Sequence, residues 1–145
     1  MSLATLGRWR ALDGERRRAV AEAFAALIVA SAMVKLLPFR HIARTATRPV
    51  RAPTAADPAA TIALVAWAVR TAARRARFRA VCIEQGLAAQ AMLRRRGVAA
   101  TLHYGVAQDG GVLTAHVWVR VGSVDVVGCE EAPKFRLLAS FDPAD

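Results

Sequence analysis

The hydrophobic pattern of this chain changes its period once, near residue 99. Before that point apolar residues follow helical spacing or fill whole segments, and after it they alternate with polar residues. Helices followed by an antiparallel meander predict an α+β fold, because a parallel sheet would need helices between its strands. A length of 145 residues is that of one domain. We divide this domain into a helical N-terminal extension with its connector, residues 1–55, and a core, residues 56–145.

Three helices are predicted in the first part of the chain, over residues 15–37, 58–77 and 82–96. The first two follow an aspartate that can cap a helix, and the third ends before a glycine. Residues 39–58 carry three prolines and no hydrophobic period, so we interpret them as a connector.

The segment 19–37 is apolar on nearly every side, which favours a helix buried on more than one side. The protein's own core is the favoured covering, and a partner protein or a membrane surface are the alternatives. Glu22 and Lys35 interrupt the segment, so its uncharged stretch is shorter than the ~18–20 residues of a spanning helix. The N-terminus is too polar for a signal peptide. We therefore expect a cytoplasmic protein whose cysteines form no disulfide.

The second part of the chain predicts three strands, over residues 99–106, 112–121 and 124–127. Glycine-containing turns separate them at 108–111 and 122–123. The tail after the third strand contains a proline and a short apolar stretch, and we assign it no regular structure.

The net charge of the chain favours acidic binding partners but does not indicate which class of partner it binds. Lysine and arginine number 21 against 11 acidic residues, a net charge of +10, which favours nucleic acid, an anionic membrane or an acidic peptide. Nucleic acid has only the charge in its favour, because the arginines gather at helix ends and no aromatic residues are interleaved with them.

Two residues form the leading candidate site. Cys82 opens a predicted helix just after a stretch rich in arginine, and both a helix N-terminus and nearby cations stabilise a thiolate. Alternation in the central strand puts His116, Trp118 and Arg120 on one face and valines on the core face. We expect the His116 face to meet the start of the Cys82 helix, where the imidazole could accept the thiol proton. The alternative is that both residues are structural, with Cys82 a buried apolar residue and His116 a hydrogen-bonded residue of the strand.

A zinc site is a weaker possibility. Cys82, Cys129, His103 and His116 have suitable side chains, but no CxxC or HxxxH spacing supports a metal site. We therefore expect neither a metal nor another cofactor, and we interpret Cys129 as a bystander.

The motifs around the candidate site are similar to those of a known family. Residues 82–106, CIEQGLAAQAMLRRRGVAATLHYGV, followed by AHVWV at 115–119, resemble the transglutaminase-like cysteine peptidases. More narrowly, they resemble the leader peptidase of lasso-peptide biosynthesis, in its split form. The resemblance implies a papain-like core in which the helix carrying Cys82 packs on an antiparallel sheet carrying His116.

The resemblance also implies a reaction and partners. Cys82 would attack the scissile carbonyl of a precursor peptide, with His116 as base and acid, and the leader would be removed. A separate leader-binding protein would assist, and an ATP-dependent lasso cyclase would take the core peptide. The family's third residue is an acid on the next strand. Asp125 and Glu130 are equal candidates for this third residue, and we expect only one of them to serve. The position at which the family usually has the Asp is occupied here by Gly128.

Two other functions remain open at this point. A non-catalytic peptide-binding adaptor of the same fold gains weight from the uncertain third acid. A basic nucleic-acid-binding domain is the less favoured alternative.

Overall fold

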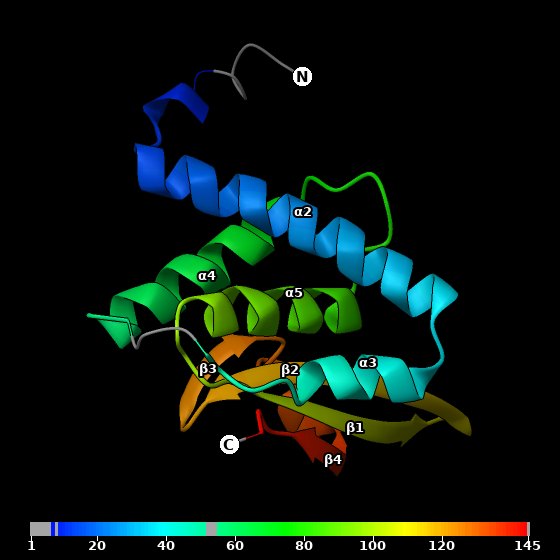
Figure 1. The fold of residues 1–145 in the computed structure, drawn as a ribbon. Coiled ribbons are helices and arrows are strands. Elements are labelled where there is room, and N and C mark those ends of the chain that lie inside the picture. Colours follow the sequence, from blue (N-terminus) through cyan, green and yellow to red (C-terminus); the bar gives the residue numbers. More distant parts are fainter. Residues whose placement is uncertain (1–6, 8, 52–54, 145) are drawn as a thin grey trace.

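The computed structural model describes residues 7, 9–51 and 55–144 and confirms the α+β class (Figure 1). Its elements are listed here in chain order: α2 (Gly14–Leu36), α3 (Phe39–Ala46), α4 (Pro58–Ala73), α5 (Cys82–Arg95), β1 (Thr101–Asp109), β2 (Val112–Val121), β3 (Val124–Val127), the 3-10 turn η1 (Ala132–Lys134) and β4 (Arg136–Phe141). The strands form one antiparallel sheet in the order β3-β2-β1-β4.

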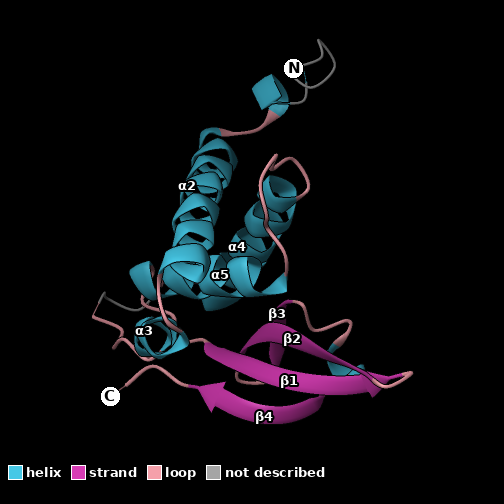
Figure 2. Ribbon diagram, turned by 90° about the vertical axis from the view of Figure 1, so that its right-hand side faces the viewer, coloured by secondary structure: helices cyan, strands magenta, loops and turns pink. Residues whose placement is uncertain are grey.

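The helices cover one face of this sheet. Figure 2 shows α5 directly above the strands, with α2 and α4 stacked beyond it. The caps expected from the sequence are present, because Asp13 accepts from the backbone N–H of Arg16 at 2.8 Å and Asp57 from that of Ala60 at 3.0 Å. The main core lies between helices and sheet, and its large, fully buried members include Leu27, Val65, Val69, Met92, Leu93, Val119, Val126 and Val127.

The contact between α5 and the sheet is close at one glycine. A Cβ on Gly86 would lie 2.8 Å from Cγ1 of Val117 and 3.5 Å from side-chain carbons of Leu102 and Val119. The alternating valines of β2 therefore face α5, as the sequence predicts for the core face. Glycine lets the helix backbone approach the strands at this point.

Two elements were not expected. Helix α3 lies in the segment interpreted as a connector. It begins directly after Pro38 and is amphipathic, with Ile42 and Ala46 buried on one side. Strand β4 lies in the tail, and it pairs with β1 across the sheet. Its residues show no clear alternation of burial, so only the long-range pairing reveals it.

An ion-pair cluster joins α2 to the end of α5. Glu22 accepts hydrogen bonds from Arg95 at 2.8 Å and from Nη1 of Arg96 at 3.1 Å. Burial alone would raise the pKa of Glu22, but the hydrogen bonds and charges of the two arginines outweigh it and hold the pKa below the ordinary 4.5.

The depressed pKa predicts a loss of stability in acid. A carboxylate whose folded-state pKa lies below its unfolded value contributes stability above the unfolded pKa, and loses it as pH falls through the folded pKa. We expect Glu22→Gln to lower the free energy of unfolding by about 1 kcal/mol at pH 7, since the pair is part exposed and screened. Below pH 4.5 the difference should shrink. Urea titrations of both proteins at several pH values measure it, and a difference independent of pH would contradict the assignment.

Candidate active site around Cys82 and His116

The start of α5 holds Cys82 in a tightly bonded first turn. Cys82 is half-buried and is the first residue of the helix. Glu84, whose side chain is 0% exposed, accepts from the backbone N–H of Val81 at 3.1 Å and from Nε of Arg79 at 3.0 Å. Gln85 donates to the carbonyl of Ala80 at 2.8 Å. These hydrogen bonds join the segment before the helix, residues 79–81, to the first turn of α5, and so hold the backbone at Cys82 in place.

The sequence analysis missed the role of Glu84 and its ion pair with Arg79, a member of the arginine-rich stretch before Cys82. A glutamate three residues into a helix is a recognised capping signal when serine or threonine stands at the cap. Here Val81 occupies the cap, so that signal is incomplete. A buried carboxylate is costly without a partner, and the Arg79 guanidinium supplies one.

His116 is oriented by a backbone carbonyl. Its Nε2 lies 2.7 Å from the carbonyl oxygen of Gly128. Because a carbonyl only accepts, Nε2 carries the hydrogen, and in the neutral ring Nδ1 is then the basic nitrogen. The ring is also stacked on Phe135, with centroids 4.8 Å apart, and on Trp118 at 6.1 Å.

Gly128 can provide this carbonyl because it has no side chain. Its φ is +74°, in the left-handed region. A Cβ there would lie 2.6 Å from the carbonyl oxygen of Val117 and 3.4 Å from Nε2 of His116. The position that the sequence analysis associates with a lost aspartate thus contributes a main-chain acceptor to the histidine.

Neither acid proposed as the third residue is bonded to His116. Asp125 accepts from Nε of Arg120 at 2.8 Å, on the β2–β3 hairpin. Glu130 accepts at 3.0 Å from Nη2 of Arg70, which also donates to the carbonyl of Val126. Both carboxylates are therefore engaged by arginines instead.

Glu131, the residue after Glu130, is paired with Lys134. The hydrogen bond from Lys134, and then its charge, hold the pKa of Glu131 below its ordinary range. Its side chain is exposed, so this ion pair lies in solvent.

The structure places the two candidate residues differently from expectation. Helix α5 packs on the valine face of β2, whereas the ring of His116 stacks with Trp118 on the other face. The expectation that the His116 face meets the start of the helix is therefore wrong: Gly86 draws α5 onto the valines. Within residues 9–51 and 55–144, no hydrogen bond joins Cys82 to His116.

An open strand edge lies beside His116. Strand β3 pairs with β2 only over Val119–Val121, and the loop beginning at Gly128 borders the edge beyond.

The remaining candidates have structural roles. Cys129 is buried and donates to the carbonyl of Val119 at 3.2 Å, and burial raises the pKa of its thiol. His103 bonds Oγ of Ser140 at 2.9 Å and stacks on Trp118, and burial lowers its pKa. Among the residues that the structure describes, no group of three or more His, Cys, Asp or Glu could hold a metal ion.

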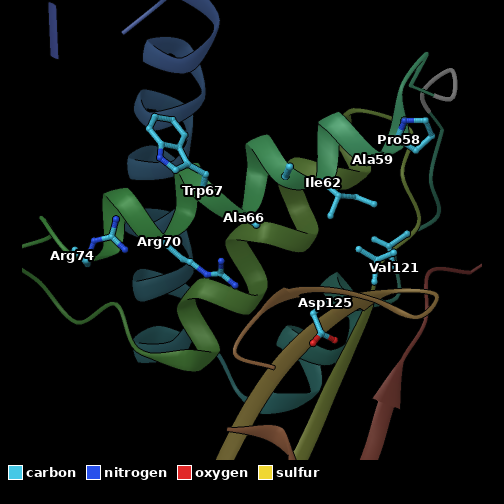
Figure 3. Close-up of a pocket in the computed structure, with 11 residues that line it drawn as sticks. Pro58, Ala59, Ile62, Ala66, Trp67, Arg70, Arg74, Val121 and Asp125 are labelled. Carbon is cyan, nitrogen blue, oxygen red and sulfur yellow. The ribbon is translucent and has the colours of Figure 1, made fainter. Parts of the chain in front are cut away.

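A groove lies beside α4 (Figure 3). It has a volume of about 770 Å³ and lies between α4 and the β2–β3 hairpin, with Ile62, Trp67 and Val124 among its apolar walls. Arg70 and Arg74 also line a second cavity of about 250 Å³, which reaches Gln85 on the first turn of α5.

Comparison with known proteins gives one match. The family model described as the Transglutaminase-like superfamily matches residues 24–140. No curated protein and no solved structure matches the chain significantly. The match covers the helix that begins at Cys82, the strand that carries His116 and strand β4.

Proposed function

Because the chain belongs to the transglutaminase-like superfamily, which includes cysteine peptidases, we propose that it removes the leader from a ribosomally made precursor peptide during lasso-peptide maturation. It would act in the cytoplasm together with a separate leader-binding protein, and would pass the core peptide to an ATP-dependent lasso cyclase. The sequence motifs at 82–106 and 115–119 support this choice within the superfamily.

The proposed chemistry follows from the two side chains. The thiolate of Cys82 adds to the scissile carbonyl carbon, and backbone N–H groups at the start of α5 stabilise the resulting oxyanion. The imidazolium of His116 gives its proton to the leaving amine as the C–N bond breaks, which leaves a thioester on Cys82. His116 then removes a proton from water, the hydroxide adds to the thioester, and the released thiolate is ready for another cycle.

The observation that carries the proposal is the tautomer of His116. The Gly128 carbonyl fixes the hydrogen on Nε2 and leaves Nδ1 unprotonated, as a general base requires. A backbone carbonyl orients the ring but has no negative charge with which to stabilise the imidazolium. We therefore expect slower chemistry than with an aspartate in this role.

The partner protein provides a test that does not depend on a mutation. The cavity beside α4 is open, and in the proposal the leader is held by the second protein. Cleavage of a precursor by the purified chain should be slow, and addition of the leader-binding protein should raise kcat/KM at least tenfold. Mass spectrometry of the products gives both the rate and the cleavage position. Equal rates with and without the partner would remove it from the proposal.

A non-catalytic adaptor is the second candidate. One observation favours it: α5 and the ring of His116 occupy different faces of the sheet. Such an adaptor would hold a peptide in the groove and leave the thiol unused. The reactivity of Cys82 distinguishes the two functions, as argued below.

A further inference from the structure

The outward side of α2 forms a continuous apolar stripe. Its inward side packs on α4 and α5 through buried residues that include Ala23, Leu27 and Ala30. On the outward side, exposed apolar residues recur every three or four positions, and we call them the α2 stripe: Ala21, Ala25, Ile28, Ala32 and Leu36. Figure 2 shows α2 along one outer side of the molecule, with α4 and α5 on its inner side.

Large apolar side chains extend this stripe to the end of α2. Ile28, Val29, Leu36 and Leu37 are between 42% and 78% exposed. Monomeric soluble proteins rarely leave such a contiguous group in water, and a patch of this kind marks an interaction surface.

Positive charge flanks the apolar residues at both ends. Arg17 and Arg18 are exposed on the first turns of α2, and Lys35 and Arg40 are exposed around its end. Of the two acidic residues of α2, Glu22 is already engaged by Arg95 and Arg96, and the exposed Glu15 offsets one of these four charges, so the flanks keep a net positive charge. Anionic lipid headgroups are complementary to such flanks, with the apolar residues inserted among the acyl chains.

The packing of α2 decides its orientation at a membrane. By length and composition alone, α2 is apolar enough to cross a bilayer. Its inward side, however, is fastened to α4 and α5 along most of its length, and the Glu22 ion pairs tie it to the end of α5. The outward side alone is free, so the helix can lie flat on a surface without unfolding the domain. A second copy of this chain would instead bring another net charge of +10 against the same arginines.

We propose that the α2 stripe and the adjoining Leu37 dock this protein on an anionic membrane surface. The inference stands on this surface alone and does not depend on the peptidase function.

Vesicle binding of the full chain tests the proposal. The probe is a set of phosphatidylcholine vesicles with and without one-third phosphatidylglycerol, and the bound fraction is measured by co-sedimentation. We expect the partition coefficient to rise at least tenfold with the anionic lipid and to fall steeply with salt. Arg17→Gln with Arg18→Gln should reduce binding about tenfold or more, since each basic residue contributes independently.

Matched variants distinguish binding through the α2 stripe from non-specific hydrophobic adsorption to the vesicles. Ile28→Glu with Val29→Glu should abolish binding, whereas Val112→Glu with Leu113→Glu, which alters equally exposed apolar residues on the β1–β2 hairpin, should lose much less. Circular dichroism and thermal melts establish that each variant is folded. Equal losses from the two pairs, or equal binding to neutral and anionic vesicles, would overturn the proposal. So would a lipid-independent dimer, measured by light scattering, that the Ile28 and Val29 changes disrupt.

Discussion

Replacement of Cys82 by alanine should reduce leader cleavage by about 10³-fold or more while leaving the fold intact. The thiol is the proposed nucleophile, and loss of a nucleophile removes the covalent route altogether. The side chain is half-buried at the first position of α5, where alanine is a good helix former, so stability should change little. Cleavage is followed by mass spectrometry of precursor and products, with the leader-binding protein present.

The second cysteine provides the matched control. Cys129 donates to a backbone carbonyl inside the structure, so Cys129→Ala should lower the melting temperature and leave kcat/KM within a few-fold of the original. Undiminished cleavage by Cys82→Ala, or an equal loss of kcat/KM in both variants, would contradict the proposed role of Cys82.

Thiol labelling distinguishes the peptidase from the adaptor in the same pair of variants. A thiolate at the start of a helix reacts fast with iodoacetamide at neutral pH, whereas a buried thiol reacts slowly. In the peptidase, Cys129→Ala should label as fast as the original protein and Cys82→Ala should label slowly. Slow labelling of Cys82 together with intact peptide binding would favour the adaptor.

The sequence predicts the parts of the fold that depend on local patterns. Capping aspartates, a helix-ending proline and alternating valines each act on neighbouring residues, and the helices and strands that they indicate are present. Helix α3 was missed because three prolines around it favoured a loop. Strand β4 was missed because its partner, β1, lies more than thirty residues earlier in the chain.

The candidate site is predictable in its residue types and not in its contacts. The sequence indicates Cys82 at a helix start and His116 on a central strand, and the structure has them there. Alternation predicts correctly that the valine face of β2 receives α5, but it does not reveal that the ring of His116 then lies on the opposite face from the helix. The partner of His116 is a main-chain carbonyl, and every residue type has one, so a search for an acid could not find it.

Gly128→Ala should be both strongly destabilising and damaging to cleavage. A left-handed φ of +74° costs a residue with a Cβ about 1–2 kcal/mol. The new Cβ would also meet the carbonyl oxygen of Val117 at 2.6 Å, and forced repacking of this kind costs a further 1–3 kcal/mol or so. Together these predict a loss of about 3 kcal/mol, or roughly a 10 °C fall in melting temperature for a domain of this size.

Gly111→Ala isolates the backbone contribution to this effect. Gly111 has a similar φ of +83°, but a Cβ there would meet nothing within 4 Å. It should lose about 1 kcal/mol and keep full activity. In Gly128→Ala, the backbone shift that relieves the clash would move the carbonyl away from Nε2 of His116, and the hydrogen would no longer be fixed on that nitrogen. We therefore expect kcat to fall in this variant, measured at temperatures where both variants are folded. Equal melting temperatures for the two variants would show that the site is not crowded, and unchanged kcat in Gly128→Ala would show that its carbonyl does not orient the histidine during the reaction.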